Sequence, residues 1–319
     1  MRIIRAEGAI LERIFDLTYP IWNEGLTRDA YARWNTAQLR TPWGRDHLVR
    51  LALVDESGDL LATAKRYRFD ARISGRTGWM CGLGAVFTPP DRTGQGHASA
   101  LIETLLEREK SEGALVACLF SEIGTGFYER LGFSVVPLDE VTVRVRSGAG
   151  APAMLVRAGT DADLPSLADM HDVRSGAVPF ALRRDPSAIA FALAKKRLFA
   201  GLSGPGTRQV EFFVAEEGAS AVAYVVLSGN QHGWTLEEAG DRDPAGARLG
   251  ALLQVLIARE PSQAPPLIRT WWPRAFPVPP QLELTDRTEP RDIMMLRSLS
   301  DAPVPARTED VFYWRSDYF

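Results

Sequence analysis

The stretch that decides the fold reads AVFTPPDRTGQGHASAL, residues 85–101. The run 81–87, almost wholly small or apolar, predicts a strand buried on both faces, and two prolines then stop it. From Ala98 the apolar residues recur every three or four positions, which predicts one face of a helix. Gly94 and Gly96 let the backbone approach a ligand, and the unpaired N–H groups of the first helical turn point toward it. We therefore expect a strand, turn and helix that bind an anion, with a ligand-free tight turn as the alternative.

The turn lacks the glycine patterns of the two common nucleotide-binding loops. Gly94-Gln95-Gly96 is followed by no third glycine at the G-x-G-x-x-G spacing of dinucleotide-binding folds. A Gly-Lys pair, which the nucleotide-triphosphate loop requires, is also missing from this stretch. The anion is therefore expected to belong to another cofactor.

A second unit of the same kind follows some thirty residues later. The run 114–120 predicts another buried strand, and FYERLGF at residues 127–133 predicts a short helix. Together, RTGQGHA at residues 92–98 and FYERLGF resemble the GNAT superfamily of acyl-CoA N-acyltransferases. The resemblance covers about residues 2–137.

This resemblance implies an α/β fold with a mixed, splayed central sheet flanked by helices, whose fourth and fifth strands open to admit the pantetheine arm of acetyl-CoA. It also implies that the loop amides bind the CoA pyrophosphate and that a strand N–H at Ala85 or Val86 stabilises the reacting oxygen. Thr93 stands where the family usually has Arg or Gln, so Arg92 beside it is expected to supply the charge. The expected cofactor-binding residues are Ala85, Val86, Arg92, Thr93, Gly94, Gln95, Gly96, His97 and Ala98.

The rest of the first domain is read from its pattern. Residues 48–55 and 60–69 alternate around turn residues and predict a hairpin, and residues 72–77 are expected to form a polar insertion. Residues 19–44 read as a polar connection rich in aromatic side chains, which in the resembled family lies over the acceptor pocket. Alternatively these aromatic side chains only pack against helices.

The length of 319 residues predicts two domains, since one such domain takes about 150 residues. We expect an acetyltransferase domain at residues 1–146, a small-residue linker at 147–153 and a second domain at 154–319. The element order of the second half matches the first, but the turn at 240–247 carries two carboxylates that would repel a pyrophosphate. The second half is therefore read as a degenerate acetyltransferase-like domain that does not bind CoA, with an unrelated α/β domain as the alternative.

Tyr128 matches the motif tyrosine of the resembled family, which lies near the cofactor sulfur. A phenol is protonated at neutral pH, so Tyr128 is the expected general acid for the departing thiolate, unless it only packs against the pantetheine arm. The central strand region 79–88 has no carboxylate, although many family members use a glutamate there. Glu122, Glu24 and Asp29 are alternative candidates for the base.

The tail at residues 311–319 supplies a further candidate base. It is densely aromatic, whereas chain ends are usually polar. Here the chain resembles tandem acetyltransferases of the enhanced-intracellular-survival type, in which the terminal carboxylate enters the active site as the base. The resemblance implies a catalytic role for the carboxylate of Phe319, and the alternative is that the tail forms the last strand of the second domain.

The motifs around the two strands are also similar to fungal lysine N-acetyltransferases, which implies a primary amine of a small molecule as acceptor; a polyamine or an aminoglycoside fits equally. A net charge of −3 argues against nucleic acid as a partner. Four scattered histidines predict no metal site. A charged N-terminus and the lack of a long apolar run predict a cytoplasmic protein without a membrane partner. The oligomeric state stays open, and a non-catalytic acyl-CoA-binding regulatory module is the rival function.

Overall fold

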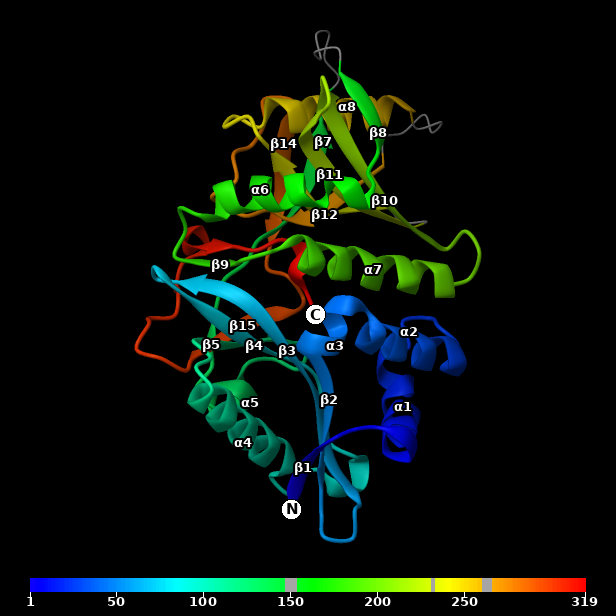
Figure 1. The fold of residues 1–319 in the computed structure, drawn as a ribbon, viewed down its shortest axis with the longest axis vertical. Coiled ribbons are helices and arrows are strands. Elements are labelled where there is room, and N and C mark those ends of the chain that lie inside the picture. Colours follow the sequence, from blue (N-terminus) through cyan, green and yellow to red (C-terminus); the bar gives the residue numbers. More distant parts are fainter. Residues whose placement is uncertain (147–153, 231–232, 260–265) are drawn as a thin grey trace. The chain divides into compact units, whose positions relative to one another are not determined.

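The computed structural model describes residues 1–146, 154–230, 233–259 and 266–319, which form two compact units (Figure 1). The expected linker at 147–153 lies outside the described residues. Each unit includes a segment from the other half of the chain. The units therefore do not coincide with the expected domains at residues 1–146 and 154–319. Unit 1 comprises Met1–Val136, Arg291–Ala306 and Phe319, and unit 2 comprises Pro137–Pro290 and Arg307–Tyr318.

Unit 1 contains a mixed sheet with the strand order β1-β2-β3-β4-β5-β15-β6. Neighbouring strands are antiparallel except β4 and β5, which run parallel because helix α4 connects them. The elements are β1 Arg2–Arg5, α1 Gly8–Trp22, α2 Arg28–Arg40, α3 Pro42–His47, β2 Leu48–Val54, β3 Leu60–Ile73, β4 Arg76–Phe87, η1 Pro90–Arg92, α4 His97–Ser111, β5 Val116–Ser121, α5 Gly126–Glu129, β6 Ser134–Val135 and β15 Ile293–Ser298.

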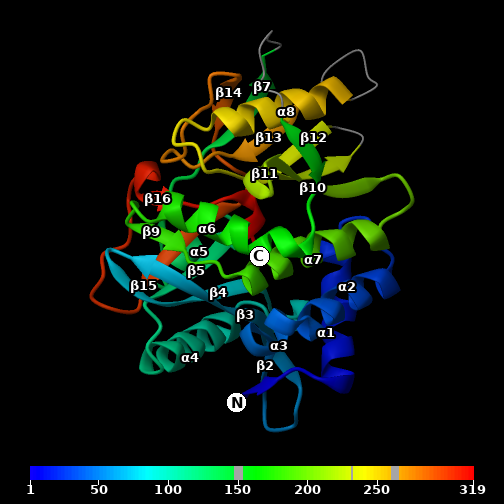
Figure 2. The ribbon, with the colours of Figure 1, turned by 45° about the horizontal axis from the view of Figure 1, so that its top comes forward.

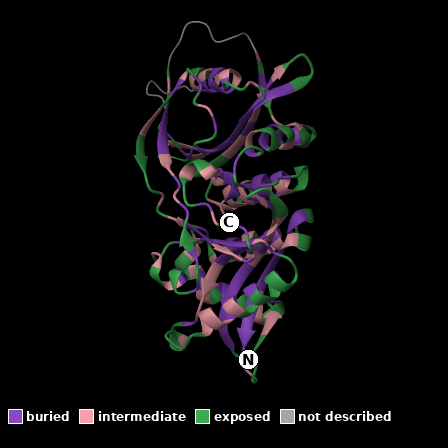
Figure 3. Ribbon diagram, turned by 90° about the vertical axis from the view of Figure 1, so that its left-hand side faces the viewer, coloured by how far each residue is buried: buried purple, intermediate pink, exposed green. Residues whose placement is uncertain are grey.

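Helices cover both faces of this sheet. Figures 1 and 2 show α1 on one side of β2 and β3 and α4 on the other. Ile14 of α1 packs with Ala52 and Leu60, whereas Leu105 of α4 packs with Leu83 on the opposite face. The apolar spacing predicted from Ala98 onward is confirmed as the buried face of α4, and Figure 3 colours most of the central strands as buried.

Two parts of unit 1 differ from the sequence prediction. Residues 19–44 do not form a plain connection but contain α2 and α3, each started by a threonine whose hydroxyl accepts from the first turn. Residues 72–77 are not an insertion, because β3 runs to Ile73 and β4 begins at Arg76 around a two-residue turn. Ser74 and Gly75 both have positive φ there, as a tight hairpin turn requires.

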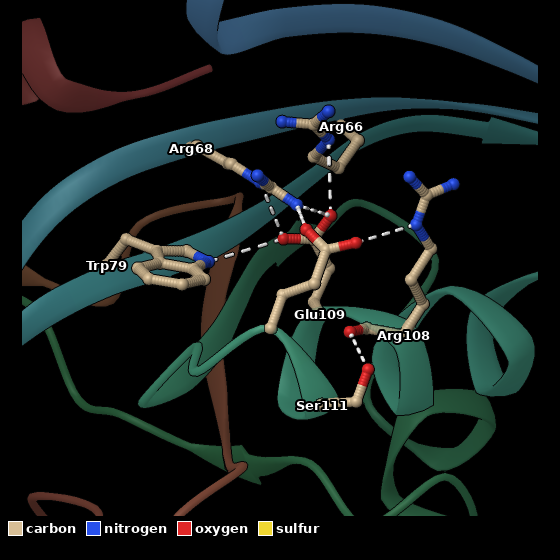
Figure 4. A network of polar contacts seen from close by, with 7 residues as sticks. Arg66, Arg68, Trp79, Arg108, Glu109 and Ser111 are labelled. Atoms are coloured by element: carbon tan, nitrogen blue, oxygen red, sulfur yellow. Dashed lines mark hydrogen bonds and ion pairs between the residues drawn. The ribbon is translucent and has the colours of Figure 1, made fainter.

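Glu109 ties the C-terminal half of α4 to the sheet (Figure 4). Its side chain is almost fully buried and accepts hydrogen bonds from Arg68 at 2.9 and 3.0 Å and from the Trp79 indole at 3.3 Å. Arg66 completes the cluster at 3.4 Å. Because a buried carboxylate is costly unless charges and donors surround it, this network fixes where α4 lies on β3 and β4.

Unit 2 has a sheet of the same topology, β8-β10-β11-β12-β13-β7-β14, again with one parallel pair, β12 and β13, joined by a helix, α8. β16 pairs with β9 in parallel. The elements are β7 Glu140–Val145, β8 Leu155–Ala158, η2 Asp161–Asp163, α6 Leu164–Ser175, β9 Phe180–Leu182, α7 Pro186–Leu202, β10 Arg208–Glu217, β11 Ser220–Asn230, β12 Gly233–Asp241, α8 Ala247–Arg259, β13 Ile268–Trp271, β14 Leu282–Thr288, η3 Thr308–Asp310, β16 Val311–Phe312 and η4 Arg315–Asp317.

The strand next to the last in each sheet comes from the distant part of the chain. β15, late in the sequence, lies between β5 and β6 of unit 1, whereas β7, early in the sequence, lies between β13 and β14 of unit 2. The predicted fold class, a splayed mixed sheet followed by a second one of the same kind, is confirmed. No helix among the described residues has the length and apolar character needed to cross a membrane.

Candidate active site

The turn between β4 and α4 is shaped by two glycines in the left-handed region. Gly94 has φ of 74° and Gly96 has φ of 80°, values that a side chain would strain. Gly96 is the N-cap of α4, so no side chain caps the helix, and its first turn carries no acidic residue. The N–H groups of that turn have no intrahelical partner and, with the helix dipole, favour an anion.

The side chains of the turn between β4 and α4 form hydrogen bonds and an ion pair within the turn. The Thr93 hydroxyl donates to the carbonyl of Pro90 at 2.9 Å, and the Gln95 amide donates to the carbonyl of Asp91 at 3.3 Å. His97 Nε2 lies 3.2 Å from the Gln95 amide oxygen, and Arg92 lies 3.4 Å from Asp91. Main-chain amides are therefore the groups that the turn leaves for a ligand, and the family's missing basic residue at Thr93 is not needed to build it.

The end of β4 separates from β5. The last paired residues of these parallel strands are Leu83 and Leu119, and β4 continues to Phe87 without a partner on that side. Ala85 has φ of 47°, and the pairing with β3 shifts between Gly84 and Phe87, which is a β-bulge. The predicted splay is confirmed, and the bulge lies at Ala85 and Val86, where the sequence places the N–H group for the reacting oxygen.

Tyr128 lies in the short helix α5 and belongs to the same apolar cluster as Leu83, with Val86 packed against it. Its side chain is buried, and that burial, followed by the nearby charge of Glu122, raises the pKa of Tyr128 to about 12. The phenol therefore stays protonated at neutral pH and holds a proton beside the splayed strand.

Phe319 lies on the other face of β4, the face that α1 and α2 cover. Its ring centroid is 5.0 Å from that of Tyr67, 5.2 Å from Phe69 and 5.4 Å from Phe120. A Cβ at Gly82 would lie 2.8 Å from the Phe319 ring, and one at Gly84 would lie 3.6 Å from its carbonyl oxygen. Two glycines on one face of β4 thus make the space that the Phe319 residue occupies.

The other candidate bases lie on exposed positions. Glu122 follows β5 and accepts from the Trp22 indole at 3.4 Å, and Trp22 contacts Phe87 at the end of β4. Asp29 is in the first turn of α2, where an acidic side chain favours the helix dipole. Glu24 is exposed, with φ of 51°. Glu122 is therefore the acidic side chain at the open ends of β4 and β5.

The sequence reasoning missed Gly82 and Gly84 as the seat of Phe319, and also the buried cations Arg50 and Lys65 on the same side of the sheet. The signal for the glycines is in the sequence, because residues 81–85 read CGLGA and alternate small with apolar side chains. The sequence does not reveal that Arg50 and Lys65 are buried, since an isolated basic residue within a strand usually lies on the exposed face of the sheet.

In unit 2 the equivalent turn is filled by its own side chains. Asp241 accepts from the N–H of Leu249 in the first turn of α8 and from the N–H of Asp243, both at 2.7 Å. Asp243 accepts from the N–H of Ala245 at 3.0 Å. Arg174 donates to the carbonyls of three residues of this turn, among them Pro244 at 3.1 Å. The N–H groups of Asp243, Ala245 and Leu249 are thus bonded to carboxylates of the turn itself.

The splayed strands of unit 2 hold the tail. β12 and β13 pair only at Trp234–Ile268 and Thr235–Arg269. Beyond that point the Ser316 hydroxyl donates to Glu238 of β12 at 2.7 Å, and Trp314 contacts Trp272, which follows β13, at 5.6 Å between ring centroids. The tail therefore forms the short strand β16, which pairs with β9, and then contacts both splayed strands.

The described residues contain no group of three metal-ligating side chains. Both cysteines, Cys81 and Cys118, are fully buried, and burial raises the pKa of each thiol. They therefore pack as small apolar groups, as their positions in apolar strands predict.

Comparison with known proteins gives a family for part of the chain. Residues 19–136 match the model of the acetyltransferase (GNAT) domain. No curated protein sequence is similar enough to match.

Solved structures are similar over both units. A GCN5-related N-acetyltransferase from Kribbella flavida shares 17% identity at a TM-score of 0.68, covering 93% of this chain and 70% of that one. A probable N-acyltransferase from Enterococcus faecalis shares 13% at a TM-score of 0.67, covering 94% and 72%. Eis1 from Mycobacterium abscessus shares 16% at a TM-score of 0.60, covering 94% and 74%. At these identities the likeness concerns the fold.

Proposed function

We propose, from the premise that residues 19–136 are an acetyltransferase (GNAT) domain, that this chain transfers an acetyl group from acetyl-CoA to a primary amine of a small molecule. The acceptor classes are an amino acid such as lysine, a polyamine or an aminoglycoside. One observation carries the proposal: an uncapped glycine turn, a splayed strand with a bulge and a buried tyrosine lie together in unit 1.

The residues of the turn fit a pyrophosphate. The amides from Thr93 to Ala98 would hold it, because the side chains of Thr93 and Gln95 are bonded within the turn. The bulge at Ala85 and Val86 would direct an N–H group to the oxygen that becomes negative during transfer. When bound, acetyl-CoA supplies a thioester that a neutral amine attacks.

Tyr128 and Phe319 would move the protons. The amine must lose a proton for attack, and we assign that proton to the main-chain carboxylate of Phe319, which lies on the acceptor face of β4. The new bond would join the amine nitrogen to the acetyl carbon while the bond from that carbon to sulfur breaks, and the nitrogen would lose its second proton to solvent. Tyr128 then donates its hydroxyl proton to the departing thiolate and regains one from solvent.

The acceptor side supports a small cationic substrate. The exposed carboxylate of Glu122 lies at the open ends of β4 and β5, where it would attract an ammonium group. Phe319 fills the space over Gly82 and Gly84.

The test is acetyl-CoA-dependent thiol release over a panel of free lysine, polyamines, aminoglycosides and peptide N-termini. We expect turnover on one small-amine class, greatly reduced in Tyr128→Phe while acetyl-CoA binding persists. Acetyl-CoA binding without turnover on any amine would contradict the enzyme and favour a regulatory acyl-CoA-binding module, which the lack of a carboxylate on β4 also fits. Turnover only on peptides would contradict the small-molecule acceptor.

A further inference from the structure

Two cations are buried side by side in unit 1. Arg50 of β2 is 3% exposed and Lys65 of β3 is 9% exposed, and the two are direct cross-strand partners. Side chains at such positions share one face of the sheet and lie close together, and like charges there oppose each other. The two together concentrate positive charge on this face of the sheet.

Arg50 finds no carboxylate within the described part of the chain. Its Nε donates to the Thr63 hydroxyl at 2.9 Å, while its Nη2 is buried without a hydrogen-bond partner. Burial lowers the pKa of Arg50 to about 10, and the phenols of Tyr31 and Tyr67 oppose that shift. Since a buried guanidinium without an anion is costly, the positive charge of this region favours an anion nearby.

The cross-strand neighbours of Arg50 lead to an anion, the carboxyl of Phe319. Lys65 is also the direct partner of Gly84 on β4, so both face the same side. A Cβ at Gly84 would lie 3.6 Å from the main-chain oxygen of Phe319 and 3.7 Å from its carboxyl carbon. The Phe319 carboxyl therefore lies over the position directly opposite Lys65, within reach of a side chain of four methylene groups. The Lys65 ammonium also lies 5.4 Å from the Trp34 ring centroid, which fixes the lysine on this face.

We propose that Lys65, with Arg50 behind it, is a positioning residue that keeps the Phe319 carboxyl ionised and in place over Gly84. This rests on the proposed function, in which that carboxylate is the base. Phe319 is half-buried and its ring packs against Tyr67, Phe69 and Phe120. In such apolar surroundings its carboxyl would otherwise tend to take up a proton and lose its ability to accept one from the amine.

The other groups around the carboxyl do not supply this charge. Gly82, Gly84 and Phe120 of β4 and β5 do not titrate. Lys195 donates to the carbonyl of Tyr318, the residue before Phe319. Within unit 1, the titratable groups on this face of the sheet are Lys65 and Tyr67 of β3, Arg50 of β2 and Tyr31 of α2.

The first test is the pH dependence of kcat/KM in Lys65→Met, with Lys65→Arg as the matched control that keeps the charge. We expect the acid limb of the profile to move upward by at least one pH unit in Lys65→Met, with kcat at pH 7 reduced and acetyl-CoA affinity unchanged. Lys65→Arg should keep the original limb. An unmoved limb in Lys65→Met, or an equal shift in both variants, would overturn the proposal.

The second test does not depend on turnover. Adding one glycine after Phe319 converts its carboxylate into an amide, and the melting temperatures of Lys65→Met, the extended chain and their combination form a double-mutant cycle. We expect the combined shift to be smaller than the sum of the two single shifts. Additive shifts would overturn the pairing. If the shifts are coupled but the extended chain turns over normally, the pairing stands and the assignment of Phe319 as base fails.

Discussion

The two units share one sheet topology but differ in what occupies the turn after the fourth strand of the sheet, β4 in unit 1 and β12 in unit 2. In unit 1 the turn has Gly94 and Gly96 and leaves the amides of α4 open. In unit 2 the carboxylates of Asp241 and Asp243 accept from three N–H groups of the corresponding turn and the first turn of α8. A protein carboxylate and a ligand phosphate satisfy the same donors, so a helix that is capped from within cannot also bind a pyrophosphate.

The same contrast applies to the splayed strands. β4 and β5 separate beyond Leu83, and the space beside β4 is lined by glycines. β12 and β13 separate earlier, and side chains of the tail bond to Glu238 and pack on Trp272. Unit 2 therefore keeps the topology of unit 1 and fills the space at its splayed strands with its own side chains.

The largest expected effect concerns Tyr128, for which unit 2 has no counterpart. The segment between β13 and β14 carries the buried Phe276 and no tyrosine. We expect Tyr128→Phe to lower kcat by about 100-fold or more, because it removes a positioned acid, with acetyl-CoA affinity unchanged. Steady-state kinetics and calorimetry check this. Phe276→Leu, the control in unit 2, should lower stability and leave kcat within about twofold; equal kinetic loss in both variants would contradict the distinction.

The second effect comes from giving unit 1 the charge that unit 2 has. Ala98→Asp places a carboxylate in the first turn of α4, where it should cap the amides and repel pyrophosphate. We expect the acetyl-CoA dissociation constant to rise about 10- to 100-fold, since each 1.4 kcal/mol is tenfold. The neutral Ala98→Asn variant is the control and should bind within a few-fold of the original chain. Unchanged affinity in Ala98→Asp would mean that the turn does not hold the pyrophosphate.

A third effect tests the cap in unit 2. Asp241→Ala removes the acceptor for the N–H groups of Leu249 and Asp243 and should lower stability by about 1–2 kcal/mol. Asp241→Asn keeps an acceptor oxygen and should cost less. Denaturant unfolding measures both, and acetyl-CoA affinity should stay the same in each. A loss of affinity in Asp241→Ala would show that unit 2 takes part in cofactor binding.

The last effect is a pH dependence specific to unit 2, which vanishes near pH 7. Burial, followed by the charge of Lys196, lowers the pKa of Lys195 to about 7. Between about pH 7 and the usual lysine pKa of about 10.4 the unfolded chain binds this proton and the folded chain does not, so stability should rise with pH across that window. The slope from one proton is at most about 1.4 kcal/mol per pH unit. Lys195→Met should flatten the rise of stability with pH, measured by denaturant unfolding at several pH values. An unchanged slope would contradict a lowered pKa of the buried Lys195.

The local elements of unit 1 were predictable because their signals are local. Buried strands, the glycine turn and the apolar face of α4 follow from side-chain spacing over a few residues. α2 was not predicted, because its sequence is polar and its buried residues include Asn35 and Gln38. The exchange of β7 and β15 could not be predicted, since strand pairing at such separations depends on the whole fold and leaves no periodicity in either strand.

The candidate site divides in the same way. Residues 92–98 and Tyr128 belong to contiguous motifs, and the structure brings the turn and the tyrosine to the splayed β4. Phe319 was placed by resemblance, and its seat on Gly82 and Gly84 depends on residues more than 230 positions away. That Asp241 caps α8 rather than only repelling phosphate required the geometry of the turn, because a charge count does not show which N–H groups a carboxylate accepts.

The most direct test of the difference between the units is the stoichiometry of acetyl-CoA binding by isothermal titration calorimetry on the whole chain. We expect one equivalent, because the turn at residues 92–98 leaves its amides open whereas carboxylates of the turn itself bond the corresponding turn of unit 2. Two equivalents, or one equivalent that survives Ala98→Asp, would contradict it.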